Sequence, residues 1–422
     1  MENEDILMAL KNGNVPSKGV RDLCVGRDNE IAEFERLLDK VDDEDKAYTK
    51  FLKGEFGDGK SFFLKVIEDM SYKKGFAVSW ITVSNNVPFN KIEIIYRNVA
   101  KNLRVKTGTS LEHIIDRWYT QHYNMASQDA DNDFEKHVIL KERIHDELEE
   151  TRQYSTTFAT VIENYAKLRS EGDTEGASSA ISWLRGDSNI PFAVKKKFNI
   201  KSEIDKTNAF GFLEALSVFI KSAVGYSGLV VLVDEVEIIR KLIRQDIRDA
   251  AYDYIRLIFD NCSNGQFQSA LFVFAGTREL FEDSKRGIPS YTALEERIKK
   301  AYETDLVDVR TPVFVLKGFD KNDIIELSKK LLDMHSDAYN WDANAKIGPI
   351  VETIAENHVS NAGLTAGKVK ARVFIRKFIT LLDTVEQNQN HFNSPEDILE
   401  EFNGNINQMD DEDEFDEYDD DW

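Results

Sequence analysis

One segment of eight residues constrains the fold of this chain most; it consists of Gly54, Glu55, Phe56, Gly57, Asp58, Gly59, Lys60 and Ser61. It fits the phosphate-loop pattern G-x-x-x-x-G-K-[ST] and follows a strand-like run at 48–52. Glycines let successive backbone N–H groups turn inward around phosphate oxygens, and the N-terminus of a following helix favours negative charge. We expect Lys60 to reach the β- and γ-phosphates and the Ser61 hydroxyl to ligate Mg²⁺. The alternative is a glycine-rich turn that carries a lysine by chance.

The residues after this loop support the first interpretation. Apolar residues recur at helical spacing from Phe62 to Met70, and Gly75 ends the pattern. The run 76–83 then has the composition of a buried strand. Strand, loop, helix and strand in this order form a right-handed βαβ unit, in which such a loop belongs. The sequence therefore predicts a nucleotide site on a parallel α/β sheet.

A third predicted strand, at 228–237, is apolar and ends in acidic residues. A carboxylate at the carboxyl end of a parallel strand points into the crevice where ligands bind in open α/β sheets. We expect Asp234 to hold Mg²⁺ through water, and Glu235 to orient and deprotonate an attacking water. A buried strand that happens to leave the sheet at acidic residues is the alternative. Two more strands are predicted at 270–275 and 313–316.

Composition limits the class of protein. Hydrophobic residues make up 41% of the chain and charged residues 31%, as in a soluble globular protein. No apolar run approaches the roughly 20 residues of a membrane span, and the N-terminus is too acidic for a signal peptide. Cys24 and Cys262 are the two cysteines, too few for a disulfide framework or a zinc cluster. We expect a cytoplasmic protein with no membrane contact.

The chain divides into four predicted parts. A segment at 1–24 precedes an ATPase core at 25–317; helical residues at 318–405 and an acidic tail at 406–422 follow. Within the core, helical patterns at 91–103, 111–123, 133–149, 156–169 and 210–223 indicate a helical insertion at about 107–206, with breaks at 127–132, 172–173 and 186–191. The first segment begins with a short helix, and a helix is also expected through Leu38.

The tail carries much of the net charge of −22, because residues 410–422 contain ten acidic side chains and no Lys or Arg. Such a run is expected to be disordered. It serves either as a solubilising tail or, with Phe415, Tyr418 and Trp422 as anchors, as a partner-docking or DNA-mimicking segment.

Basic residues form only modest clusters, at 195–201, 240–248 and 368–377. Each is read either as a solvated helix face or as part of a channel that holds a DNA backbone without reading its sequence.

Several motifs resemble a known family. Val25-Gly26-Arg27, Asp234-Glu235 and the run 275–278 resemble the AAA+ ATPases of the origin-recognition and STAND-like branches. The combination resembles more closely the BrxD-like, BREX-type ATP-binding proteins of phage defence. Further matches lie at 14–16, 54–64, 183–187, 225–229 leading into 234–237, and 293–297.

This resemblance implies roles for further residues. Thr277 stands where AAA+ proteins place a polar residue that senses the γ-phosphate, although the origin-binding branch prefers asparagine there. Arg297 is the candidate for an arginine that acts on a neighbouring subunit's site, with a surface arginine paired to Glu295 or Glu296 as the alternative. Arg372 is the candidate for a nucleotide-sensing arginine of a helical lid, with Ala371 in place of the usual proline. The residues assigned to nucleotide contact are Val25, Gly26, Arg27, Gly54, Glu55, Phe56, Gly57, Asp58, Gly59, Lys60, Ser61, Phe62, Thr277 and Arg372.

The resemblance implies a homo-oligomeric ATPase that binds ATP and Mg²⁺ and acts in phage defence with a helicase-like partner on DNA. Two other functions stay open. One is an ATP-gated, STAND-like switch or scaffold with slow turnover, which the intact Asp234-Glu235 pair disfavours. The other is a metabolic kinase, for which the sequence offers no acceptor signature.

Overall fold

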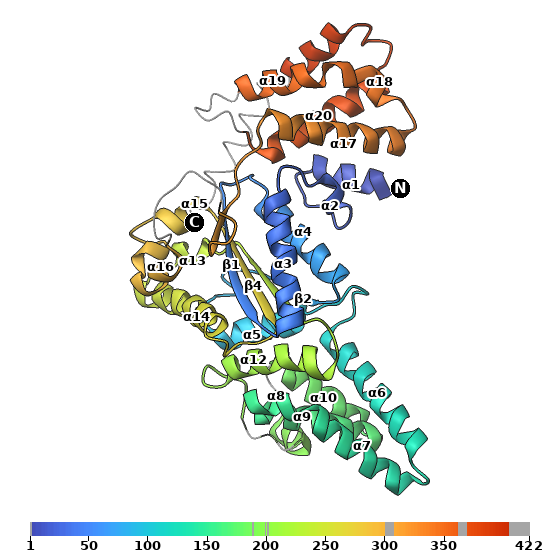
Figure 1. Ribbon diagram of the computed structural model, residues 1–422, viewed down its shortest axis with the longest axis vertical. Helices are drawn as coiled ribbons and strands as arrows, with labels where there is room; N and C mark the ends of the chain where they lie inside the picture. Colours follow the sequence, from blue (N-terminus) through green and yellow to red (C-terminus); the bar gives the residue numbers. More distant parts are fainter. Residues whose placement is uncertain are drawn as a thin grey trace. The chain divides into compact units, whose positions relative to one another are not determined.

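The computed structural model describes residues 2–187, 190–198, 200, 202–299, 308–361 and 369–404 (Figure 1). The chain forms two compact units. Unit 1 comprises residues 1–31, 54–69 and 315–422, and unit 2 comprises residues 32–53 and 70–314. The predicted acidic tail at 406–422, Lys201 of the first basic cluster and Lys368 of the last lie outside the described residues.

A five-stranded, all-parallel sheet organises unit 2, in the order β2-β3-β4-β1-β5. Its strands are β1 (Ala47–Lys53), β2 (Ala77–Thr82), β3 (Leu229–Asp234), β4 (Ala270–Gly276) and β5 (Val313–Val315). All five were expected from the sequence, and the α/β class with a parallel sheet flanked by helices is confirmed. Every residue of β3 and β4 is buried. Unbroken apolar runs of this kind are typical of central strands that are covered on both faces.

Helices cover both faces of the sheet. Successive strand residues point to opposite faces. Lys50 of β1 pairs with Glu33 of α3 (Asp28–Glu44), whereas the ring of Phe51 lies 6.4 Å from that of Phe259 in α14 (Gln245–Ser263). Helices α3 and α14 therefore lie on opposite faces, and α5 (Ile92–Asn102) packs on β2.

A large group of helices stands between β2 and β3 in the sequence, and Figure 1 shows them gathered at one end of the sheet. They are α6 (Leu111–Asp129), α7 (Asp133–Glu147), α8 (Glu149–Tyr154), α9 (Thr156–Ser170), α10 (Thr174–Leu184), α11 (Phe192–Lys195), η1 (Lys196–Phe198), α12 (Ala209–Val218) and the π-helical η2 (Phe219–Ala223). Whether residues 107–206 form a separate insertion stays a prediction.

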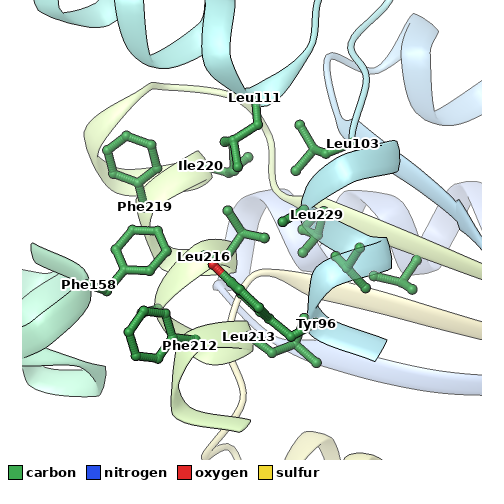
Figure 2. Packing of buried hydrophobic residues seen from close by; sticks show 14 of the residues in the cluster. Tyr96, Leu103, Leu111, Phe158, Phe212, Leu213, Leu216, Phe219, Ile220 and Leu229 are labelled. Atoms are coloured by element: carbon green, nitrogen blue, oxygen red, sulfur yellow. The ribbon is translucent and has the colours of Figure 1, made fainter. Parts of the chain in front are cut away.

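Aromatic and aliphatic side chains join these helices to the sheet. The ring of Phe212 lies 5.6 Å from that of Tyr96 and 5.8 Å from that of Phe158. Figure 2 shows these rings with Phe219, and Leu216 near Leu229, the first residue of β3. The helices thus pack at the amino ends of the strands, opposite the edge where ligands bind in such sheets.

Two details of this helical region differ from the sequence prediction. Helix α6 continues through Asp129 into the expected break, because the Ser127 hydroxyl donates to the Tyr123 carbonyl and stays compatible with the helix. Helix α10 was not predicted; Asp173 begins it by accepting from the Gly176 N–H at 2.8 Å.

The remaining elements of unit 2 follow β3 and β4. They are α13 (Ile238–Lys241), α15 (Arg278–Glu282), η3 (Ile288–Ser290) and α16 (Thr292–Ile298).

Unit 1 has its own apolar core among helices from both ends of the chain. These are α1 (Glu2–Lys11), α2 (Val20–Leu23), α17 (Lys321–Tyr339), α18 (Ala343–Ile347), η4 (Gly348–Ile350), α19 (Val351–Asn361), α20 (Ala371–Gln387) and a helix at 395–404. A buried polar network fixes α1 to α17 and α20: Asp383 accepts from Lys11 at 2.6 Å and from His335 at 3.0 Å. Within the described residues, no helix combines the length and apolar character needed to cross a membrane.

Candidate functional site

The glycine-rich loop belongs to unit 1 and begins directly after β1 in the chain. Gly57 and Gly59 have φ values of 87° and 88°, which only glycine adopts without strain. The Lys60 ammonium donates to the carbonyl oxygens of Gly54 and Glu55 at 3.2 and 3.0 Å. Helix α4 (Lys60–Lys73) starts at this lysine, so the loop closes on the N-terminus of a helix.

Asp58 shapes the same loop from within. Its carboxylate accepts from the Glu55 N–H at 2.7 Å. Burial raises the pKa of Asp58 above its ordinary value, and the hydrogen bond and the nearby Lys60 charge oppose this effect only in part. The carboxylate is therefore a local structural group of the loop rather than a free anion.

The start of α20 lies against the loop within unit 1. The Arg372 guanidinium is 5.8 Å from the centre of the Phe56 ring, and a Cβ on Gly57 would lie 3.4 Å from the Lys370 side chain. On its other side, Arg372 approaches Gly13 so closely that a Cβ there would lie 2.7 Å from its nitrogens. The structure thus brings predicted residues Phe56, Gly57 and Arg372 together.

The segment Val25-Gly26-Arg27 meets the start of α17. Val25 is buried in the core of unit 1, and Gly26 has a φ of 63°. A side chain on Gly26 would overlap the carboxylate of Asp323, which forms the capping box of α17 with Asp320. Arg27 donates to the carbonyl of Lys317. This segment therefore packs closely against the C-terminal helices of unit 1. The apolar core of these helices also contacts Phe62.

The end of β3 holds the two predicted acids in unit 2. Asp234 is only 5% exposed, and its Oδ1 accepts from the Glu235 N–H at 3.0 Å. Glu235 has a backbone φ of 57°, which is unfavourable for any residue other than glycine. The following Val236 N–H donates to the Ala275 carbonyl of β4 at 3.1 Å, which fixes the turn. Such strain is found mainly at functional sites.

The neighbouring strand β4 ends at Gly276, and Thr277 caps α15. The Thr277 hydroxyl is buried and has no hydrogen-bond partner within the described part of the chain. A Cβ on Gly276 would lie 3.4 Å from a carboxylate oxygen of Glu237. A polar atom without a partner at this edge is the kind of group that a ligand satisfies.

The sheet order places these strand ends side by side. Strands β3, β4 and β1 are consecutive, and their parallel register pairs Lys53 with Gly276. The carboxyl edge of unit 2 therefore presents Asp234, Glu235 and Thr277 next to the strand from which the glycine-rich loop leaves. Carboxylate oxygens, as offered by Asp234, are among the ligands that Mg²⁺ prefers.

Arg297 lies in α16 and is bound within its own chain. Its Nε donates to the Asp260 carboxylate of α14, and its Nη1 donates to the Ala293 carbonyl. Arg256 donates to the other oxygen of Asp260 at 2.9 Å. The sequence alternative paired Arg297 with Glu295 or Glu296, but the structure pairs it with a residue 37 positions earlier, which no local pattern could indicate.

Sequence reasoning did not single out Lys370 as a site residue, although it lies over Gly57. The feature of the sequence that could have indicated Lys370 is its position near Arg372, just before a helix. Sequence reasoning also missed the left-handed backbone of Glu235, because a glutamate carries no local indication of such a conformation.

Comparison with known proteins agrees with this geometry. No individual curated protein matches the chain. A family model described as "BREX system ATP-binding protein BrxC/D" matches residues 1–401, nearly the whole chain. The family predicted from the sequence motifs is thereby confirmed. The chain belongs to the BREX system ATP-binding proteins of the BrxC/D family.

Proposed function

We propose that this BREX ATP-binding protein hydrolyses ATP with Mg²⁺ in the manner of AAA+ ATPases. One observation carries the proposal: consecutive parallel strands end at Asp234-Glu235, at Thr277 and at the start of the glycine-rich loop. This is the order of groups that phosphoryl transfer to water requires, namely a phosphate cradle, a metal ligand and a base.

Each residue has a defined task in this proposal. The loop N–H groups and Lys60 hold the phosphates, and Lys60 exchanges its contacts with the carbonyls of Gly54 and Glu55 for phosphate oxygens. Glu235 accepts a proton from the attacking water, and Thr277 donates its hydroxyl toward the γ-phosphate. Ser61 and Asp234 would hold Mg²⁺, which would neutralise charge on the phosphates.

The helical region of unit 1 acts as the lid in this proposal. Lys370 and Arg372 place two positive charges at the loop, next to Gly57 and Phe56. Loss of the γ-phosphate removes negative charge from this position and so weakens the attraction that holds α20 there. Hydrolysis thereby changes how the lid engages a partner, for which we propose a helicase-like protein acting on DNA. Any DNA contact is made through the basic clusters and does not read sequence.

The test is steady-state ATP hydrolysis by the wild type and Glu235→Gln, over a range of protein concentrations, with and without duplex DNA. Turnover that depends on concentration and DNA, and falls about 10²- to 10⁴-fold in the variant, is expected for an assembled ATPase whose base is removed. ATP binding by both proteins serves as the control for an intact site. Tight binding with negligible turnover in the wild type would contradict the proposal.

One observation favours an ATP-gated switch with slow turnover instead. Arg297, the candidate for catalysis across a subunit interface, already binds Asp260 of its own chain. A mixing experiment separates the two functions. Arg297→Ala and Glu235→Gln subunits, each inactive alone, should regain turnover when mixed if Arg297 acts on a neighbour's site. Arg256→Ala is the matched control, because Arg256 also binds Asp260. If both arginine variants behave alike and mixing restores no turnover, the result favours the ATP-gated switch.

A further inference from the structure

A pocket of about 340 Å³ lies in unit 2, between α6, α7 and the residues that follow η2. Apolar side chains of Ile114, Met125 and Val224 form part of its wall. Arg117, Glu147 and Tyr226 supply polar groups. All of these residues belong to the helical region between β2 and β3, so the pocket is separate from the carboxyl edge of the sheet.

Three residues that line this pocket carry buried nitrogens with no hydrogen-bond partner within the described part of the chain: Nε1 of Trp118, Nδ1 of His122 and Nε of Arg143. Trp118 is 4% exposed and His122 7%, so bulk water does not satisfy them. The Trp118 and Arg143 nitrogens can only donate. Because a buried donor without a partner is destabilising, this cluster favours an acceptor from outside the described residues.

The nearby Trp183 shows how the same region satisfies a tryptophan when the chain provides an acceptor. Trp183 is equally buried, at 1% exposed, and its Nε1 donates to the Ser202 carbonyl at 3.1 Å. The unsatisfied state of Trp118 is therefore particular to the pocket.

The backbone at the pocket is also unusual. Ala223 closes the π-helical η2, and π-helical turns occur frequently at functional sites. The Phe219 ring of η2 packs against Trp118 at 5.6 Å, and the His122 ring lies 5.0 Å from Trp118. Phe219 in turn belongs to the core (Figure 2). The aromatic wall is thus packed into the core of unit 2.

The charges around the pocket indicate what it binds. Arg143 keeps a positive group there, with one Nη bound to Asp129, and Arg117 adds a second. Glu147 is the one carboxylate among the lining residues. We propose that the pocket binds a small anionic ligand through a carboxylate or phosphate group, whose oxygens accept from Trp118 and Arg143 while its remainder contacts Ile114 and Met125.

This site can be tested independently of ATP hydrolysis. The chain contains five tryptophans, so ¹⁹F NMR of protein labelled with 5-fluorotryptophan can follow Trp118, assigned from Trp118→Phe. Inorganic phosphate and acetate are titrated separately at constant ionic strength, with acetamide as the neutral control. We expect a saturable shift of the Trp118 resonance with one anion, and no shift with acetamide. Saturation by phosphate identifies a phosphate ligand, and saturation by acetate identifies a carboxylate.

Variants sharpen the test. Arg117→Gln, at an exposed position, should keep the fold and weaken anion binding about tenfold, corresponding to about 1.4 kcal/mol. Without ligand, Trp118→Phe should destabilise the protein less than Trp183→Phe, because only the latter breaks an existing hydrogen bond.

The proposal is overturned if the Trp118 resonance shows no saturable shift up to ~50 mM anion, where a ligand bound by about 4 kcal/mol would saturate the site. Equal shifts of all five resonances would overturn it too, since they would report a non-specific effect of the anion on the protein.

Discussion

The glycine-rich loop of unit 1 and the end of β3 in unit 2 are held in shape in different ways. The loop owes its shape to Gly57 and Gly59, and its lysine is held by two backbone carbonyls. The end of β3 is anchored in the core: Asp234 is buried, and Glu235 adopts a left-handed conformation without being glycine. Lys60 can exchange its hydrogen bonds to carbonyl oxygens for hydrogen bonds to a ligand. The positions of Asp234 and Glu235, in contrast, are fixed by the packing around them.

In the proposed function, this difference would separate ATP binding from ATP hydrolysis. A loop whose cation exchanges one set of oxygens for another adapts to its ligand at little cost. A strained residue persists only where its surroundings determine it, as the Val236–Ala275 hydrogen bond does here. Changes in the loop should therefore alter ATP affinity, and changes at the strand end should alter turnover or stability.

Among the effects on binding and stability, the largest is expected for ATP affinity in Lys60→Ala. Loss of the ammonium should weaken binding about 100-fold, or ~2.7 kcal/mol, because no other loop side chain supplies this charge. Lys65→Ala is the matched control, since Lys65 lies on the same helix and pairs with Glu68. Isothermal titration with ATP measures both variants. Equal losses in the two would contradict the special role of Lys60.

Gly26→Ala tests how far unit 1 depends on glycine. The variant should lose about 2 kcal/mol of stability, partly from the positive φ and partly from overlap with the capping carboxylate of Asp323. Gly172→Ala is the control, because its φ is 79° but nothing lies within 4 Å of an added Cβ. Urea unfolding should show a larger loss for Gly26→Ala; equal losses would mean that backbone strain alone matters.

Glu235→Gly tests the opposite case, a strained position that is not glycine. Removing the side chain relieves a left-handed strain of about 1–2 kcal/mol and adds a chain-entropy cost of about 0.5–1 kcal/mol. The variant should therefore be stabilised by up to about 1.5 kcal/mol while it loses turnover. Glu235→Gln keeps the strain and should match the wild type in stability. A Glu235→Gly protein less stable than both would show that the side chain supports the fold.

The strands and the family were predictable because their signals are local. The apolar runs that became β3 and β4, and the pattern from Gly54 to Ser61, each specify their structure through residues adjacent in sequence. Asp234 and Thr277 could be placed at strand ends for the same reason, since each stands at the end of a recognisable strand.

Contacts between distant residues were beyond sequence reasoning. Nothing near Arg297 points to Asp260, and nothing in α6 indicates that Trp118 would be left without an acceptor while Trp183 finds one. Helix α10 was missed because Gly176 and several serines weaken its helical pattern, whereas the cap at Asp173 and the buried Trp183 stabilise it in the fold.

The smallest expected effect concerns the pH dependence of the loop. Burial raises the pKa of Asp58, so the protonated form is favoured in the folded protein. The stability that this residue contributes is present below its ordinary pKa of 3.8 and is lost as the pH rises through the raised value. Asp58→Asn keeps an oxygen for the Glu55 N–H but cannot titrate. The unfolding midpoint of Asp58→Asn, compared with that of the wild type, should therefore increase as the pH rises above 3.8.

Asp205→Asn provides the control for this shift. A hydrogen bond from the Thr207 hydroxyl, supported by the Thr207 N–H, lowers the pKa of Asp205, so its contribution changes only below its ordinary pKa of 3.8. The difference in unfolding midpoint between this control and the wild type should therefore not change above pH 3.8. If the Asp58→Asn curve is equally flat, burial does not control the Asp58 carboxyl. The Asp58 carboxylate, like the Lys60 ammonium, would then be free to exchange its contacts. The difference between the environments of Asp58 in the loop and of the buried Asp234 would be larger still.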